Sequence, residues 1–209
     1  MAAFNIMQGL SAQVKIEEKE DGYVFTVVPG EDPELELSSR LETEALPVKP
    51  GDIDFEQCPR CGVPLYFKEC TWDFDEGTIT DNMTGRNMSS LGMEHIAAVF
   101  RELEAELGED IARVIMTAQR DYIKGALLKE ELEKGYPYFV LFFALRGMGN
   151  LVQFDMSDDA LAAAVENASP PLMVAGILQG IYEAKSDRES TCDYKRGDDG
   201  TLSVSIQAL

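Results

Sequence analysis

Apolar and polar residues alternate near the start of the chain, in a pattern typical of a β-hairpin. Segment 12–29 reads AQVKIEEKEDGYVFTVVP, with Glu-Asp-Gly at 20–22 between its two alternating halves. An Asp-Gly pair between two such runs favours a tight hairpin turn, because glycine adopts the positive φ that the turn needs. We therefore expect a hairpin here, followed by an acidic connector rich in Pro and Gly over 30–57, with one short strand at 34–37.

Helical periodicity replaces this alternation in the middle of the chain. The spacing predicts a first helix that begins near Ser89 or Ser90 and ends at Gly108, and a second helix over 109–133. Segment 137–145, PYFVLFFAL, is apolar on all sides and is expected to be buried. Periodicity does not distinguish a helix from a strand in such a run, and we favour a helix. The apolar face of the first helix consists of Ile96, Val99, Phe100, Leu103 and Leu107.

The last part of the chain predicts two strands, a helix and a second hairpin. The strands are expected at 151–156 and 161–166, and two prolines can open a helix whose body covers 172–184. Segment 190–206 is typical of a hairpin that turns at Gly-Asp-Asp-Gly. Helices followed by this β-β-α-β-β order predict an α+β fold, with helices packed on one side of a four-stranded antiparallel sheet.

Composition and charge restrict the class of protein. Hydrophobic residues make up 45% and charged residues 27% of the chain, which is typical of a soluble globule. The longest apolar run, YFVLFFAL, is far shorter than the ~20 residues that cross a bilayer. The first residues, MAAFNIMQGLSAQVK, lack the basic segment and long apolar core of a secretion signal. We expect a cytoplasmic protein with no membrane partner. Its formal net charge of −20 repels phosphate backbones and argues against nucleic acid as a partner.

Three of the four cysteines lie in CPRCGVPLYFKEC, residues 58–70. Cys58 and Cys61 have the spacing of a zinc knuckle, whose turn directs both thiolates at one cation. A closed zinc site needs four ligands, and Cys70 supplies a third. The alternatives for the fourth are a cysteine of a second subunit or one of Cys192, Asp73, Glu69 and His95. The sequence thus predicts a structural zinc, with Cys58, Cys61, Cys70 and Cys192 as its ligands and free thiols as the alternative.

Other chemistry has less support from the sequence. A thioredoxin-like redox pair opens a helix, whereas Gly62, Val63 and Pro64 follow the Cys-Pro-Arg-Cys sequence and disfavour one. His95 is the only histidine, so a Ser-His-Asp arrangement would have to use it. Segment 146–150, RGMGN, lacks the Lys-Ser/Thr ending of a phosphate loop and predicts a tight turn. No catalytic residue is predicted, and we favour a protein that is not an enzyme.

The order of motifs in the second half of the chain resembles a 4-vinyl reductase domain of the hydrocarbon-binding protein type. The resemblance covers residues 93–209. Within it lie the Gly147/Gly149 pair, the Gly176-x-x-x-Gly180 spacing and Cys192 before its Gly-Asp turn. The matching segments are LEAELGEDI (103–111), ALRGMGNLVQFDM (144–156), VENASPPLMVAGILQGIYEA (165–184) and ESTCDYKRGDDGTLSVSI (189–206).

This resemblance implies a fold shared with haem-nitric-oxide-binding domains and with vesicle-tethering TRAPP subunits. It also implies a homodimer and a buried apolar pocket for a hydrophobic or aromatic small molecule. Met173 and Leu202 stand near positions where the family carries cysteines, so a metal site in this half is not expected from the family pattern. The chain has no Tyr-x-Ser-x-Arg motif of the haem-binding relatives, and no haem is expected. The domains would be a hairpin with its connector (1–50), a Cys-rich segment (51–92) and the ligand-binding domain (93–209).

The apolar residues of three expected helices are candidates for the pocket, although most of them would also serve as plain core. Ligand sites are apolar with a few placed polar groups, for which Tyr122, Arg146 and Tyr182 are candidates. We expect the cavity between the long helices and the four-stranded sheet, with helix 172–184 as one wall. The other candidates are Phe100, Phe139, Phe142, Phe143, Val174, Ile177, Leu178 and Ile181.

Three hypotheses about function follow. The first is a non-enzymatic binding or sensor protein that holds a hydrophobic or aromatic small molecule, with zinc stabilising its N-terminal part. The second is a scaffold or accessory protein with a filled core that mediates assembly. The third is an accessory subunit of an enzyme acting on a tetrapyrrole or an aromatic compound. The sequence favours the first, because it shows neither a nucleophile–base pair nor a redox-cofactor motif.

Overall fold

The computed structural model describes residues 12–19, 22–29, 48–82, 84–89, 91–108 and 110–209. The chain forms two compact units, Met1–Glu42 and Thr43–Leu209. The short strand expected at 34–37 lies outside the described residues, so it stays a prediction, as do the domain boundaries expected at residues 50 and 92.

The first unit contains the predicted hairpin. Strands β1 (Ala12–Lys19) and β2 (Gly22–Pro29) pair antiparallel, with Lys19 opposite Gly22 and Ile16 opposite Phe25. The alternation of apolar and polar residues therefore gave the correct strands and the correct pairing.

The second unit begins with the Cys-rich segment, which ends in a small sheet. A 3-10 helix, η1 (Leu65–Glu69), leads into strands β3 (Cys70–Asp73), β4 (Thr78–Asp81) and β5 (Asn87–Met88). The strands form an antiparallel sheet in the order β3-β4-β5. We call β3, β4 and β5 the small sheet.

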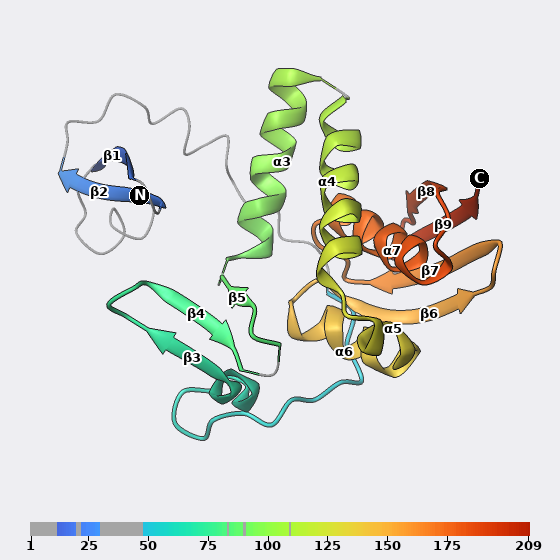
Figure 1. Cartoon of the computed structure of the whole chain (residues 1–209), viewed down its shortest axis with the longest axis horizontal. Coiled ribbons are helices and arrows are strands. Elements are labelled where there is room, and N and C mark those ends of the chain that lie inside the picture. Colours follow the sequence, from blue (N-terminus) through green and yellow to red (C-terminus); the bar gives the residue numbers. More distant parts are fainter. Residues whose placement is uncertain (1–11, 20–21, 30–47, 83, 90, 109) are drawn as a thin grey trace. The chain divides into compact units, whose positions relative to one another are not determined.

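Four helices follow the small sheet. They are α3 (Met93–Leu107), α4 (Asp110–Ala126), α5 (Lys129–Glu133) and α6 (Tyr136–Leu145). Helices α3 and α4 lie side by side (Figure 1). The helix expected for the apolar run at 137–145 is confirmed by α6. Among the described residues, no helix has both the length and the apolarity that crossing a bilayer requires.

Two helix boundaries differ from the sequence-based expectation. Helix α3 begins at Met93 with Gly92 as its N-cap, a few residues after the serines expected there, whereas its C-cap is Gly108 as predicted. The single helix expected over 109–133 is broken between Ala126 and Lys129. Contacts at the break explain it, because the Glu131 carboxylate accepts the Leu128 N–H at 2.8 Å while the Arg86 guanidinium donates to the Ala126 carbonyl oxygen.

The C-terminal part forms the expected four-stranded antiparallel sheet. Its strands are β6 (Asn150–Met156), β7 (Ala160–Glu166), β8 (Ser190–Arg196) and β9 (Leu202–Ala208). They are ordered β6-β7-β9-β8, and every neighbouring pair is antiparallel. Helix α7 (Pro171–Ser186) connects β7 to β8 and crosses one face of the sheet (Figure 1). The mixed α/β class predicted from the order of elements is confirmed.

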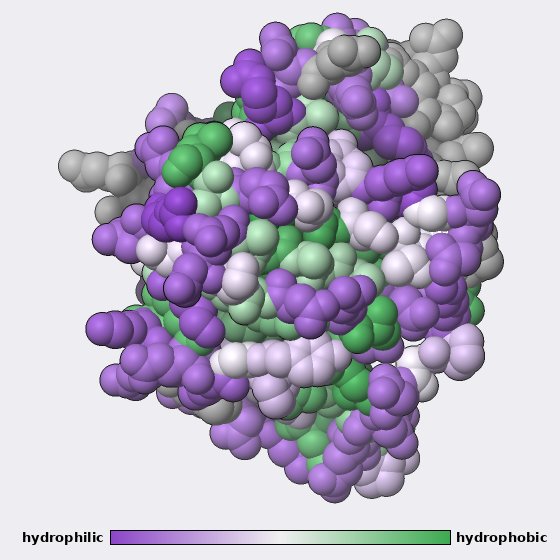
Figure 2. All heavy atoms as spheres, turned by 90° about the vertical axis from the view of Figure 1, so that its right-hand side faces the viewer, coloured by the Kyte–Doolittle hydropathy of each residue, from purple (hydrophilic) through white to green (hydrophobic). Residues whose placement is uncertain are grey.

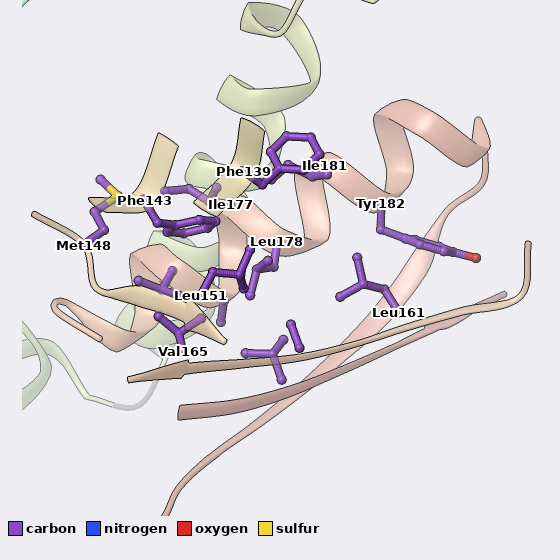
Figure 3. Close-up of a cluster of buried hydrophobic side chains, with 14 of the residues drawn as sticks. Phe139, Phe143, Met148, Leu151, Leu161, Val165, Ile177, Leu178, Ile181 and Tyr182 are labelled. Carbon is purple, nitrogen blue, oxygen red and sulfur yellow. The ribbon is translucent and has the colours of Figure 1, made fainter. Parts of the chain in front are cut away.

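The hydrophobic core lies between α7 and this sheet and extends to α4 and α6. Strand β9 alternates strictly, with Leu202, Val204 and Ile206 buried and the intervening residues exposed. Figure 3 shows side chains of α7 meeting those of the strands below the helix. On the face drawn in Figure 2, hydrophilic residues are interspersed with smaller hydrophobic areas, as the scattered charges in the sequence indicate.

Candidate ligand-binding site

A cavity of about 430 Å³ lies among the small sheet, α3, α4, α6 and α7. Its volume falls in the range of ~300–1,000 Å³ that is usual for small-molecule sites. The small sheet and its flanks contribute Tyr66, Phe67, Cys70, Trp72, Ile79, Asn87, Met88, Ser89 and Leu91. The helices and the turn after α6 contribute Met93, Ile96, Gln119, Tyr122, Ile123, Phe142, Leu145, Arg146, Met148, Met173 and Ile177. Most of these side chains are apolar or aromatic.

The turn after α6 brings two of its residues to the cavity. The N–H of Gly147 donates to the Ala144 carbonyl oxygen at 3.0 Å, and the N–H of Met148 donates to the Phe143 carbonyl oxygen at 3.0 Å. Gly147 has φ 64°, a value that glycine adopts without strain. Segment 146–150 is thus the tight turn predicted from its sequence, and both Arg146 and Met148 line the cavity beside it.

Arg146 is the one charged side chain among the described residues that line this cavity. Its Nη1 donates to the Phe142 carbonyl oxygen at 3.2 Å, and its guanidinium carbon lies 3.8 Å from the centre of the Phe142 ring. This position over the ring face permits a cation–π interaction. Burial lowers the pKa of Arg146 from its usual value, because the charged form loses hydration.

Carboxylates near this region are engaged with other partners. The Asp81 carboxylate accepts hydrogen bonds from Tyr66 Oη at 3.4 Å and from Thr84 Oγ1 at 3.0 Å. Burial raises the pKa of Tyr66, and the Asp81 charge adds to the effect, so its phenol stays neutral and keeps its proton for donation.

The Glu131 carboxylate lies at the junction of α4 and α5. It pairs with Arg86 Nη2 at 2.7 Å and accepts a hydrogen bond from the Tyr138 hydroxyl. Burial alone would raise the pKa of Glu131, but hydrogen bonds from Arg86, Tyr138 and the Leu128 N–H outweigh burial and lower the pKa. Arg86 precedes β5, so this ion pair attaches the small sheet to the helices.

The predicted ligand-binding residues divide into three groups. Tyr122, Phe142, Arg146 and Ile177 line the cavity, and Phe100 lines a separate hollow of about 220 Å³. The remaining six lie in the hydrophobic core between the helices and the four-stranded sheet, where the sequence placed the cavity. They are Phe139, Phe143, Val174, Leu178, Ile181 and Tyr182.

Several cavity-lining residues were missed by the sequence reasoning. Tyr66, Phe67 and Trp72 belong to the Cys-rich segment, which we interpreted only as a metal knuckle. The concentration of aromatic residues beside the cysteines was the signal that could have indicated a second role. These aromatic side chains show that η1 and the small sheet together form a wall of the cavity.

The predicted knuckle forms a tight turn. Gly62 N–H donates to the Cys58 carbonyl oxygen at 2.8 Å, and Cys58 N–H donates to the Val63 carbonyl oxygen at 2.8 Å. Hydrogen bonds from the backbone N–H of Arg60 and of Cys61 lower the pKa of the Cys58 thiol. A lowered pKa favours the thiolate, which is the form that binds metals.

The other two predicted zinc ligands lie in different surroundings. Cys70 begins β3 and faces the cavity, and burial raises the pKa of its thiol. Cys192 lies on β8 with its Sγ 3.9 Å from the Ala175 carbonyl oxygen, and burial raises its pKa to about 12. Within the described ranges, no group of three or more His, Cys, Asp or Glu side chains is placed to hold a metal ion. Zinc binding therefore stays a prediction.

Comparison with known proteins shows which solved structures have a similar fold. No family model matches the chain, and no curated protein matches it in sequence. Among solved structures, it is similar to the phenol-responsive sensory domain of the transcription activator PoxR, solved with phenol. The two share a TM-score of 0.50 and 12% identity over 67% of this chain and 85% of that domain. The chain therefore has the fold of this sensory domain.

Weaker similarity extends to H-NOX domains. An oxygen-binding H-NOX domain related to soluble guanylate cyclases matches with a TM-score of 0.38 and 15% identity, over 59% of this chain and 75% of that one. An H-NOX structure from work on heme distortion matches with a TM-score of 0.40 and 15% identity, over 59% and 75%.

Proposed function

We propose that this protein is a non-enzymatic binding or sensor protein that holds a hydrophobic or aromatic small molecule. The observation that carries the proposal is the cavity of about 430 Å³ lined by aromatic and apolar side chains. The fold agrees with it, because the similar PoxR domain is a phenol-responsive sensory domain. The ligand would lie between the small sheet and the helices.

The chemistry of the cavity wall supports an aromatic ligand. Tyr66, Trp72 and Phe142 line the cavity from three different elements, η1, β3 and α6. Aromatic rings gain from offset-stacked and edge-to-face contacts in addition to the area that they bury. A flat ring system would therefore find partners on more than one wall.

The finer parts of the proposal are a cytoplasmic location, expected from the sequence itself, and a homodimer, implied by the resemblance to a 4-vinyl reductase domain. The homodimer has support in α3 and α4, where Val99, Leu103, Leu107 and Val114 are exposed. Apolar residues gathered on neighbouring helices are typical of an interface. Light scattering coupled to gel filtration would measure the mass, and a monomer at micromolar concentration would contradict this part.

The chain contains its own reporter of binding. Trp72 is the only tryptophan, and it lines the cavity. A ligand in the cavity should change its fluorescence and should raise the melting temperature, because it binds only the folded state. We would titrate 2-naphthol and phenol while following this fluorescence, and examine freshly purified protein by native mass spectrometry.

Two variants of α7 distinguish a cavity from a packed core. Ile177 faces the cavity, so Ile177→Phe should fill part of it and weaken binding while the protein stays folded. Leu178, the next residue, is fully buried in the core, so Leu178→Phe should overpack it and lower stability by ~1–3 kcal/mol. If neither probe changes the fluorescence and both variants are equally destabilised, the function as a small-molecule binder is wrong.

A further inference from the structure

The charge distribution around the cavity indicates more about its ligand. Among the described residues that line it, Arg146 is charged and no carboxylate is present. The described carboxylates form no ion pair with Arg146, whose one hydrogen bond within the described chain goes to the Phe142 carbonyl oxygen. A guanidinium has five N–H donors, so most of its donors have no acceptor in the described chain.

An arginine in this position is unusual for this protein. The chain has 38 acidic residues and 18 basic ones, yet Asp81 and Glu131 make hydrogen bonds and ion pairs with residues other than Arg146. Asp81 accepts hydrogen bonds from Tyr66 and Thr84, and Glu131 pairs with Arg86. Asp81 acts on Arg146 electrostatically but forms no ion pair with it. A partly buried guanidinium without a carboxylate in direct contact costs free energy, which an incoming anion would offset.

We propose that the ligand is an aromatic carboxylate whose carboxylate group pairs with Arg146. This inference rests on the proposed function and specifies its ligand. The planar fork of a guanidinium matches the two oxygens of a carboxylate, so the pair can form two parallel hydrogen bonds. With the carboxylate at Arg146, the ring of the ligand lies among the aromatic and apolar residues of the small sheet and α7.

The same geometry disfavours a neutral phenol as the preferred ligand. A phenol has a pKa of ~10 and is neutral at pH 7, whereas a carboxylic acid with a pKa of ~4 is ionised. A phenol and a carboxylate would both accept hydrogen bonds from the charged guanidinium, but only the carboxylate carries the opposite charge and two oxygens for a bidentate pair. A carboxylate should therefore bind more tightly than a phenol or a carboxamide with the same ring system.

The experiment compares 2-naphthoate, 2-naphthamide and 2-naphthol, which share one ring system and differ in charge. Dissociation constants come from Trp72 fluorescence and from calorimetry on the full chain. We expect 2-naphthoate to bind about tenfold or more tightly than 2-naphthamide, as a charge-assisted hydrogen bond predicts. Added salt should weaken the binding of 2-naphthoate and leave the binding of 2-naphthamide unchanged.

Variants of Arg146 then assign the effect to this side chain. Arg146→Gln should remove the advantage of 2-naphthoate while 2-naphthamide binds as before, and Arg146→Lys should restore part of it. Equal binding of 2-naphthoate and 2-naphthamide to the unaltered protein would overturn the inference and leave the proposed function intact. An advantage of 2-naphthoate that survives in a folded Arg146→Gln variant would also overturn it. If none of the three probes binds, both the inference and the proposed function fail.

Discussion

Gly180 on α7 lies directly against Ile123 on α4. A Cβ built on Gly180 would stand 2.8 Å from the Cβ of Ile123 and 2.7 Å from the carbonyl oxygen of Arg120. One turn earlier, a Cβ on Gly176 would stand 2.5 Å from the carbonyl oxygen of Met116. The two helices therefore approach at the backbone because these positions lack side chains. The close approach sets the positions of Ile123 and Ile177 at the cavity.

Gly180→Ala should destabilise the protein by ~1–3 kcal/mol, the usual cost of overpacking. The added methyl would meet a backbone oxygen and a β-branched side chain, neither of which can move without shifting α4. This cost should exceed the gain of ~1 kcal/mol that alanine brings to a helix. Urea unfolding followed by circular dichroism measures the difference.

Gly125 on α4 provides the matched control. A Cβ at this position would meet nothing within 4 Å, so Gly125→Ala should leave stability unchanged or raise it by up to ~1 kcal/mol. Equal effects of the two substitutions would show that α4 and α7 do not pack as described.

Glu183→Ala should lower the free energy of unfolding by ~2 kcal/mol, mainly by leaving buried donors without an acceptor. The Glu183 carboxylate accepts hydrogen bonds from Ser190 N–H at 3.1 Å and from Ser190 Oγ at 2.9 Å, and it pairs with Lys124 Nζ at 2.7 Å. The Lys124 side chain is partly exposed and can turn towards water. Its loss of an ion-pair partner should therefore contribute less to the destabilisation than the unpaired Ser190 donors do. Thermal and urea unfolding would measure the effect. The exposed Glu189 provides a control, since Glu189→Ala should change stability by less than ~0.5 kcal/mol.

Stability should depend on pH through Glu131. Its pKa is lowered in the folded protein relative to the ordinary 4.5, so the folded state favours the ionised form. The resulting stabilisation is fully present above pH 4.5 and is lost as the pH falls through the lower, folded pKa. The difference in unfolding free energy between the unaltered protein and Glu131→Gln should therefore be larger at neutral pH and shrink in acid. A difference that stays constant would contradict the role of the Arg86–Glu131 pair.

Purified protein should carry about one zinc ion per chain, because the Cys58–Cys61 turn has knuckle spacing and backbone hydrogen bonds that lower the pKa of the Cys58 thiol. Elemental analysis of protein purified without added metal would measure it. Cys58→Ser should reduce the zinc content and lower the melting temperature, since binding of a structural metal is coupled to folding. Cys192→Ser separates the alternatives for the fourth ligand, because unchanged zinc content would exclude Cys192. Protein that contains no zinc would leave these thiols free.

The sequence predicted the elements of the C-terminal sheet better than the faces of its strands. Strand β6 was expected at nearly its observed bounds. Its pairing with β7 shifts between Leu151 and Gln153, so Val152 lies in a bulge. The bulge allows Leu151 and Phe154 to pack towards the helices, although their spacing of three residues would put them on opposite faces of a regular strand. Local alternation does not reveal such an irregularity.

The features of the site that could not be predicted from the sequence depend on contacts between residues far apart in the chain. The break before α5 depends on Arg86, which lies far from it in the sequence. A pocket and a packed core have the same composition, so Ile177 and Leu178 could not be assigned to one or the other by their residue types. Arg146 was identified as a candidate because apolar ligand sites carry a few placed polar groups, and the structure places it at the cavity.

The walls of the cavity come from the small sheet with its flanks, residues 66–91, and from the helices and turn that follow, residues 93–177. A ligand in contact with both would hold them together through non-covalent contacts. Local opening that separates the small sheet from α4 and α7 would then require release of the occupant, and its free energy would rise with ligand concentration. Fraying at the β8–β9 edge breaks no contact with the cavity. Amide hydrogen exchange in β3, β4 and β5 should therefore slow on binding, while exchange in β8 continues at its own rate.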